Sequence, residues 1–158
     1  MSRSRDLIGL ALFLAVGIVV LAVGGRVTAT SVGTWYQTIN RPSFNPPDWV
    51  FAPVWTALFI AMSVAAWRVW RVGGLAACRT EMGLYAIQLA FNLGWSVVFF
   101  GLRQIGWGFV EMVVLFVLIV ATGLRFGRID RIAGWLFAPY VAWVAYALVL
   151  NGAIWVLN

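Results

Sequence analysis

Five long apolar segments, separated by shorter stretches that carry most of the arginines, dominate this sequence. An α-helix rises about 1.5 Å per residue, so about 20 apolar residues cross a hydrocarbon core of about 30 Å. The segments therefore predict an all-α integral membrane protein, a bundle of five transmembrane helices in a single domain over 1–158. We place the helices at approximately 7–25, 49–67, 82–102, 105–124 and 132–158.

The composition agrees with a membrane protein. Hydrophobic residues make up 63% of the chain and charged residues only 10%, a balance that a soluble domain of this size could not hide from water. The first segment follows Arg3 and Arg5, as in a signal peptide, but its 19 uncharged residues exceed the apolar core of about 7–15 residues typical of such a peptide. We therefore expect a retained transmembrane helix.

The rarest residue types restrict the chemistry. The chain has no histidine and a single cysteine, Cys78, which disfavours metal sites, Ser-His-Asp hydrolysis and histidine-ligated haem. We predict no metal site and no required cofactor. The net charge of +6 comes from arginines that flank apolar segments, so we attribute it to membrane topology and expect the lipid bilayer, and no nucleic acid, as a partner.

The arginines are unequally divided between the two ends of the predicted bundle. Eight of the 11 fall in the N-terminus and the second and fourth connections: Arg3, Arg5, Arg68, Arg71, Arg79, Arg125, Arg128 and Arg131. The positive-inside rule then places the N-terminus in the cytoplasm. The arginine bias favours a bacterial inner membrane, with an outer membrane as the alternative.

The connection between the first two helices, 26–48, has the most unusual composition. The stretch 35–55 holds four of the five prolines and three of the ten tryptophans. We expect a loop that covers the mouth of the bundle, with Asp48 or Asn45 capping the next helix and Pro53 kinking it. The candidate loop or gate residues are Trp35, Tyr36, Arg41, Pro42, Pro46, Pro47 and Trp49.

Polar and aromatic residues recur at helical spacing on three of the segments, which places them on shared faces. The faces are Trp55, Phe59, Met62 and Ala66; Gln88, Asn92, Trp95 and Phe99; and Tyr140, Trp143, Ala147, Asn151, Ile154 and Asn158. Facing one another, they would line a pocket of flat rings with a few hydrogen-bonding groups. The alternative is that the amides only hold the helices together.

Glu111 is the one acidic residue well inside a predicted membrane span. An ionisable group at this depth suggests a function by default, here a proton-coupled small-molecule transporter. The alternative is structural, with Arg103 or water neutralising the carboxylate.

Several of these stretches together resemble the TspO/MBR family of tryptophan-rich sensory proteins and translocator proteins. The resemblance rests on Trp35-Tyr36, on 41–51 (RPSFNPPDWVF), on 53–58 (PVWTAL), on Gln88…Asn92…Trp95, and on Pro139-Tyr140…Trp143…Ala147…Asn151. It implies a five-helix bundle, often a homodimer, that binds porphyrins and isoquinoline-type ligands under the first long loop. The sterol-recognition motif of animal members is missing, because no basic residue follows Tyr146.

The resemblance implies a porphyrin-binding sensor or regulator, with a part in tetrapyrrole transport or light-dependent degradation. The ligand would be similar to protoporphyrin IX, a broad flat ring that can stack on indole without a histidine ligand. The implied ligand-binding residues, to which the helical spacing adds Gln88, are Trp55, Phe59, Gln88, Asn92, Trp95, Trp143 and Ala147. In the enzymatic alternative, photo-oxidation of the porphyrin, Trp55 and Trp143 would be redox-active neighbours; no conventional catalytic motif is present.

Overall fold

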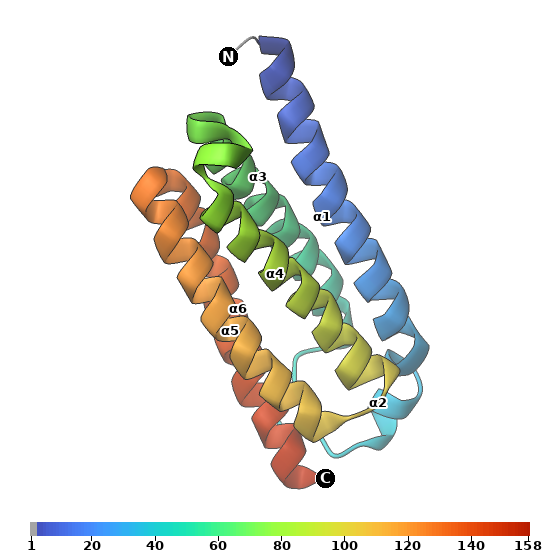
Figure 1. Ribbon diagram of the computed structural model, residues 1–158. Coiled ribbons are helices and arrows are strands. Elements are labelled where there is room, and N and C mark those ends of the chain that lie inside the picture. Colours follow the sequence, from blue (N-terminus) through green and yellow to red (C-terminus); the bar gives the residue numbers. More distant parts are fainter. Residues whose placement is uncertain (1–2) are drawn as a thin grey trace.

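Five membrane-spanning helices build the computed structural model, which describes residues 3–158 (Figure 1). They are α1 (Arg3–Val32), α3 (Phe51–Ala77), α4 (Arg79–Ser96), α5 (Ile105–Ile129) and α6 (Arg131–Leu157). Three short elements complete the fold: α2 (Trp35–Thr38), the 3₁₀ turn η1 (Asp48–Val50) and the π-helical turn η2 (Val97–Gly101). The all-α five-helix bundle and the integral membrane class are confirmed.

The spanning helices form an elongated bundle in which the two chain ends lie at opposite ends (Figure 1). In that view α1 flanks one side, α3 and α4 occupy the middle, and α5 and α6 run together along the other side. The connection that contains α2 crosses the end opposite to the N-terminus. An odd number of spans requires this separation of the termini.

The first helix is longer than the sequence pattern suggested. We expected it to end at Gly25, with a loop over 26–48, but α1 continues to Val32. Hydroxyl side chains stabilise the added turns: Thr30 donates to the Val27 carbonyl (2.7 Å), and Ser31 donates to the Phe100 carbonyl (2.7 Å). Arg26 therefore lies in a helix, and the connection is shorter than predicted.

The predicted end of the second helix at residue 67, which left 68–81 as a connection, is also wrong. Helix α3 continues to Ala77, with one interruption at Gly74, and Cys78 alone separates it from α4. Gly74 has a φ of 68°, a left-handed value that a residue without Cβ adopts at little cost. At Gly74 the helix changes direction, and it does not end in a loop there.

The start of α3 differs from its predicted capping and kink. Neither Asp48 nor Asn45 caps the helix through its side chain. Pro53 is the third residue of α3, where the backbone N–H would have no intrahelical partner in any case. Non-helical backbone angles occur within the helix only at Gly74 among the described residues, so Pro53 produces no kink.

The turn between α4 and α5 is tight, as the sequence predicted at Arg103 and Gln104. Arg103 adopts a φ of 59°, the one left-handed residue other than glycine in the described part of the chain. Before the turn, α4 widens into η2, and this wider turn leaves both Phe99 and Phe100 buried. Their rings pack against Tyr36 on the crossing connection.

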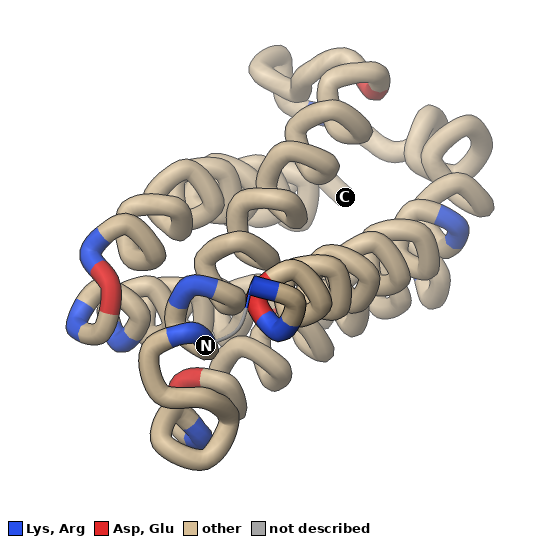
Figure 2. Tube along the Cα trace, turned by 90° about the horizontal axis from the view of Figure 1, so that it is seen from above, with Lys and Arg blue, Asp and Glu red and all other residues tan. Residues whose placement is uncertain are grey.

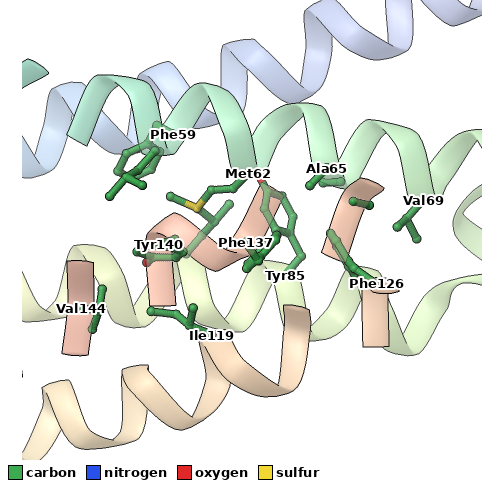
Figure 3. Packing of buried hydrophobic residues seen from close by; sticks show 14 of the residues in the cluster. Phe59, Met62, Ala65, Val69, Tyr85, Ile119, Phe126, Phe137, Tyr140 and Val144 are labelled. Atoms are coloured by element: carbon green, nitrogen blue, oxygen red, sulfur yellow. The ribbon is translucent and has the colours of Figure 1, made fainter. Parts of the chain in front are cut away.

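The core lies between α3, α4, α5 and α6 (Figure 3). Figure 3 shows side chains from these helices meeting along the bundle axis, with Met62 near Tyr140 and Phe126 near Tyr85 and Phe137. Helices α5 and α6 approach each other closely, since a Cβ on Gly134 would lie 2.6 Å from the Gly127 Cα. Small residues permit such backbone contact, and van der Waals packing is one of the forces that associate helices in lipid.

Most of the charge lies at one end of the bundle. Figure 2 looks from that end, and the arginines gather there around the N-terminus. Two ion pairs tie helices together at this end: Arg68 with Asp130 at 2.8 Å and Arg71 with Asp6 at 3.2 Å. Asp130 also accepts a hydrogen bond from the Ala133 backbone N–H (3.0 Å) and so caps α6.

Candidate ligand-binding site

A cavity of about 380 Å³ lies between α1, α3 and α4, beneath the connection that contains α2. Its volume falls within the range of about 300–1,000 Å³ that is usual for small-molecule pockets. Its wall is mostly apolar. The lining residues are Val20, Leu21, Gly24, Gly25, Thr28, Ala29, Val32, Tyr36, Asp48, Phe51, Ala52, Trp55, Thr56, Phe59, Asn92, Trp95, Ser96 and Phe100.

The wall from α3 and α4 contains four of the predicted ligand-binding residues: Trp55, Phe59, Asn92 and Trp95. Trp55 lies 6.1 Å from Tyr140 between ring centroids, at an edge-to-face angle of 73°. Trp95 stacks on Phe99 with the ring planes 20° apart. These contacts fix both indoles and give the cavity two rigid aromatic surfaces.

The wall from α1 was not predicted. Seven residues of α1, from Val20 to Val32, line the cavity, whereas the sequence analysis assigned the pocket to three other helices. This helix has no amphipathic pattern, because most of its surface faces outward. The signal that could have found it is the spacing of small residues: Gly24 and Thr28, and Gly25 and Ala29, are four apart.

Gln88 lies outside the cavity, in a buried polar network between α3, α4 and α6. Asn92 Nδ2 donates to the Tyr140 hydroxyl oxygen (2.7 Å), and the Tyr140 hydroxyl donates to Gln88 Oε1 (3.2 Å). Gln88 Nε2 approaches the Met62 sulfur at 3.6 Å. Gln88 therefore holds helices together, as in the alternative given for the amides. Asn92 belongs to the same network and also lines the cavity.

Trp143 and Ala147 also lie outside the cavity lining. The Trp143 ring is 5.9 Å from Phe51 between centroids, and Phe51 is part of the wall. The Phe51 ring therefore lies between Trp143 and the cavity. No ring contact joins it to Trp55 in the described part of the chain, so the two tryptophans of the photo-oxidation alternative are not direct neighbours.

The connection closes the cavity at its outer end through Tyr36 and Asp48. The Tyr36 hydroxyl donates to Asn45 Oδ1 (2.6 Å), and burial raises the pKa of this hydroxyl to about 12, against smaller opposing and reinforcing charge effects. Gln37 donates to Asp48 Oδ2 (2.7 Å) and accepts from Arg41 (2.9 Å). The Arg41 guanidinium lies over the Tyr36 ring at 5.1 Å from its centroid.

Helix α6 anchors this connection from the other side. The Asn40 backbone N–H donates to Asn158 Oδ1 (2.9 Å), and Asn158 Nδ2 donates back to the Asn40 carbonyl (2.9 Å). The Tyr146 hydroxyl donates to the Phe44 carbonyl at 2.6 Å. The loop is therefore a fixed cover, held by identifiable hydrogen bonds.

The remaining predicted gate residues have separate positions. Trp35 packs edge-on against Phe99 (5.7 Å between centroids) and is partly buried. Trp49 is 73% exposed, as expected for a tryptophan at a membrane interface. The others line a second, open hollow on the outer face of the loop: Arg41, Pro42, Pro46 and Pro47.

Glu111 lies on α5 away from the cavity lining. Its Oε1 would be 3.1 Å from a Cβ on Gly94 of α4, so the carboxyl group is wedged between two helices. Neither carboxyl oxygen has a hydrogen-bond partner within the described chain, and the ion pair with Arg103 that the sequence allowed is not formed there. On α6, the Asn151 amide is likewise buried without a partner among these residues.

Comparison with known proteins gives a consistent result. The model of the TspO/MBR family matches residues 10–156. The chain is 40% identical over 156 residues to the tryptophan-rich protein TspO of Chlorobaculum tepidum, which covers 98% of this chain and 99% of that protein. It is 38% identical over 123 residues to the translocator protein of Sus scrofa (77% and 73% covered), and 40% identical over 117 residues to the tryptophan-rich sensory protein of Cereibacter sphaeroides (74% and 72%).

Proposed function

Because the chain belongs to the TspO/MBR family, we propose that it is a membrane-embedded tetrapyrrole-binding protein that acts as a sensor or regulator. The ligand class is metal-free porphyrin similar to protoporphyrin IX, which needs no axial ligand from the protein. The cavity between α1, α3 and α4 is the proposed site.

The observation that carries this proposal is that two tryptophans, Trp55 and Trp95, line the cavity. Indole rings offer broad apolar faces, and aromatic pairs add about 0.5–1.5 kcal/mol beyond the area that they bury. Asn92 and Ser96 place a few polar atoms on the same wall. Arg41 lies over the ring of Tyr36, which lines the cavity, and would meet the propionates of a porphyrin that reaches this end.

The asymmetry of charge supports an orientation for this protein. The arginine-rich end carries the N-terminus, and basic residues favour the cytoplasmic side of a membrane. We propose a bacterial inner membrane, an N-terminus in the cytoplasm, and a cavity whose loop-covered end faces the opposite side. A homodimer, as the family resemblance implies, belongs to the same proposal and is tested by light scattering of the purified protein.

A titration with protoporphyrin IX, read by tryptophan fluorescence, tests the proposal. We expect saturable quenching, because a porphyrin in the cavity lies within transfer distance of Trp55 and Trp95. The same titration of N-acetyltryptophanamide in the same detergent controls for absorption by the porphyrin and for its partitioning into the micelle, and should give no saturation. Linear quenching of the protein that never saturates, or equal quenching of the protein and of this compound, would refute the proposal.

Glu111 supports one other function, proton-coupled transport of a small molecule. Its carboxyl oxygens are buried without partners between α4 and α5, and such a group in a span is a candidate proton carrier. Vesicles loaded with protein should then show uptake driven by a pH gradient, which Glu111→Gln abolishes. Uptake that persists in Glu111→Gln would assign this carboxyl group a structural role.

A further inference from the structure

A second apolar hollow, outside the cavity described above, runs along the surface between α5 and α6. It measures about 690 Å³ and is open along one side. Its floor is formed where Gly123, Gly127 and Gly134 bring the two helices into close contact. From Arg131 to Ala145, its lining residues on α6 cover about 21 Å at a rise of about 1.5 Å per residue. We call this hollow the α5–α6 groove.

Two arginines stand at the end of the groove that belongs to the arginine-rich side of the bundle. Arg128 lies in the last turn of α5 and Arg131 is the first residue of α6, and both line the groove and are exposed. Neither makes an ion pair with any described residue. Two guanidinium groups that line one end of an apolar channel complement the charge of an anionic amphiphile.

The nearby acidic groups are already engaged by other arginines. Asp130 lies between the two groove arginines in sequence, but its carboxylate pairs with Arg68 at 2.8 Å and accepts from the Ala133 N–H. Glu81 is 4.0 Å from Arg125. The positive charge of Arg128 and Arg131 is therefore left for a partner outside this chain.

Trp135 marks the depth at which that partner sits. It lines the groove one turn below Arg131 and is 73% exposed. Exposed tryptophan is typical of the headgroup region of a bilayer. The groove thus begins among lipid headgroups and continues into the hydrocarbon region, where lipid chains lie.

We propose that the α5–α6 groove is a binding site for an anionic phospholipid. Arg128 and Arg131 hold the phosphate through charge-assisted hydrogen bonds, and one acyl chain lies in the groove over the contact between Gly127 and Gly134. Zwitterionic lipids fit the same channel but gain less from the arginines. This site shares no residue with the proposed tetrapyrrole cavity.

Native mass spectrometry of the purified protein with phosphatidylglycerol or phosphatidylcholine of identical chains tests this site. We expect tighter binding of phosphatidylglycerol. The double variant Arg128→Gln/Arg131→Gln should lose about fivefold in affinity per arginine, since a basic residue near an anionic surface contributes about 1 kcal/mol. Binding of phosphatidylcholine should fall by less, because its choline group offsets the charge of the phosphate that the arginines hold.

The control is Arg3→Gln/Arg79→Gln, which removes the same charge from two exposed arginines on the same side, outside the groove. It should keep the preference for phosphatidylglycerol. Equal losses in the two double variants would overturn the proposal, because they would show a general attraction to the positive end.

A steric variant tests the channel itself. Ala142 is exposed and lines the groove, so Ala142→Phe should displace both lipids, while Ala90→Phe, on an exposed position of α4 outside it, should displace neither. Lipid binding that survives Ala142→Phe would overturn the proposal. So would a result in which Ala142→Phe only dissociates a dimer, since the groove would then hold a second copy of the chain.

Discussion

Trp55 and Trp143 were paired by the sequence, but the structure gives them different positions relative to the cavity. Trp55 forms part of the wall, whereas Trp143 lies behind Phe51. Trp55→Leu should therefore weaken protoporphyrin binding by about twofold to tenfold, because it removes the free energy of one aromatic pair. Trp143→Leu should weaken it by less. Fluorescence titration of each variant measures the effect.

The matched control is Trp107→Leu, because Trp107 is 69% exposed and lies outside the cavity lining. It should alter the total emission and leave the affinity unchanged. A larger loss of affinity in Trp143→Leu than in Trp55→Leu would mean that the ligand lies on the α6 side, away from the cavity identified here.

Gln88 was expected to touch the ligand, but its amide is engaged by Tyr140 and Met62. Gln88→Leu would leave the Tyr140 hydroxyl without its acceptor, at a cost of about 1–2 kcal/mol for an interhelical hydrogen bond in a membrane. We expect a lower midpoint of thermal unfolding in detergent and an unchanged affinity for protoporphyrin. An unchanged unfolding midpoint together with weaker binding would instead indicate that Gln88 contacts the ligand.

Asp130 stabilises the helices in two ways, and two different variants can distinguish them. It caps α6 and pairs with Arg68 of α3. Asp130→Ala should lower the free energy of unfolding by about 1–2 kcal/mol, as for a lost helix cap, plus the ion pair. Asp130→Asn should keep the cap and lose only the charge. Identical unfolding midpoints for the two variants would contradict the capping role.

The pH dependence of the same group has a definite sign. Desolvation raises the pKa of the Asp130 carboxyl, but the hydrogen bonds from Arg68 and Ala133 and the charge of Arg68 together hold it below its ordinary value. Its contribution to stability is therefore complete above the unfolded pKa of about 3.9 and is lost as the pH falls through the lower folded pKa. Unfolding midpoints between pH 7 and pH 3 should fall less in Asp130→Asn than in the original protein.

The loop is anchored to α6 by Asn158, which exchanges two hydrogen bonds with the Asn40 backbone. Asn158→Ala should raise the dissociation rate of protoporphyrin by about threefold to tenfold, because each such bond contributes about 1 kcal/mol. Val156→Ala, at a position 86% exposed, is the control for this end of α6. A dissociation rate that Asn158→Ala leaves unchanged would show that these two bonds do not limit escape of the ligand.

Deleting 35–47 should reduce the affinity for protoporphyrin further and leave the five helices intact.

The helices were predictable to different degrees for physical reasons. The number of spans follows from length and hydropathy alone, since a bilayer requires about 20 apolar residues per crossing. The ends of α1 and α3 were not predictable in this way. Polar residues such as Thr30 and Ser31 can end a helix or, as here, bond back to the backbone, and the choice depends on the neighbour that Ser31 meets in η2.

Only part of the cavity lining could be predicted from the sequence. The aromatic positions on α3 and α4 were found because their spacing places them on inward faces. The wall from α1 was missed because its small and aliphatic residues leave room for the cavity without any amide or aromatic side chain that would indicate a binding site. Which of the polar residues form a network and which line a cavity depends on the packing of all the helices.

If the tetrapyrrole binds in the cavity between α1, α3 and α4, a side chain that fills this cavity should weaken binding. A Cβ on Gly25 would meet nothing within 4 Å, and Gly25 lines the cavity, so Gly25→Leu fills it without disturbing the helix contacts. Gly83 on α4 has the same free space but lies outside the cavity, which makes Gly83→Leu the matched control.

The measurement is the dissociation constant of protoporphyrin IX for the two variants and the original protein, by tryptophan fluorescence. Gly25→Leu should weaken binding by about fivefold or more, since overpacking a filled site costs about 1–3 kcal/mol, and Gly83→Leu should bind as the original protein does. If Gly25→Leu binds protoporphyrin as tightly as Gly83→Leu, the ligand does not occupy this cavity.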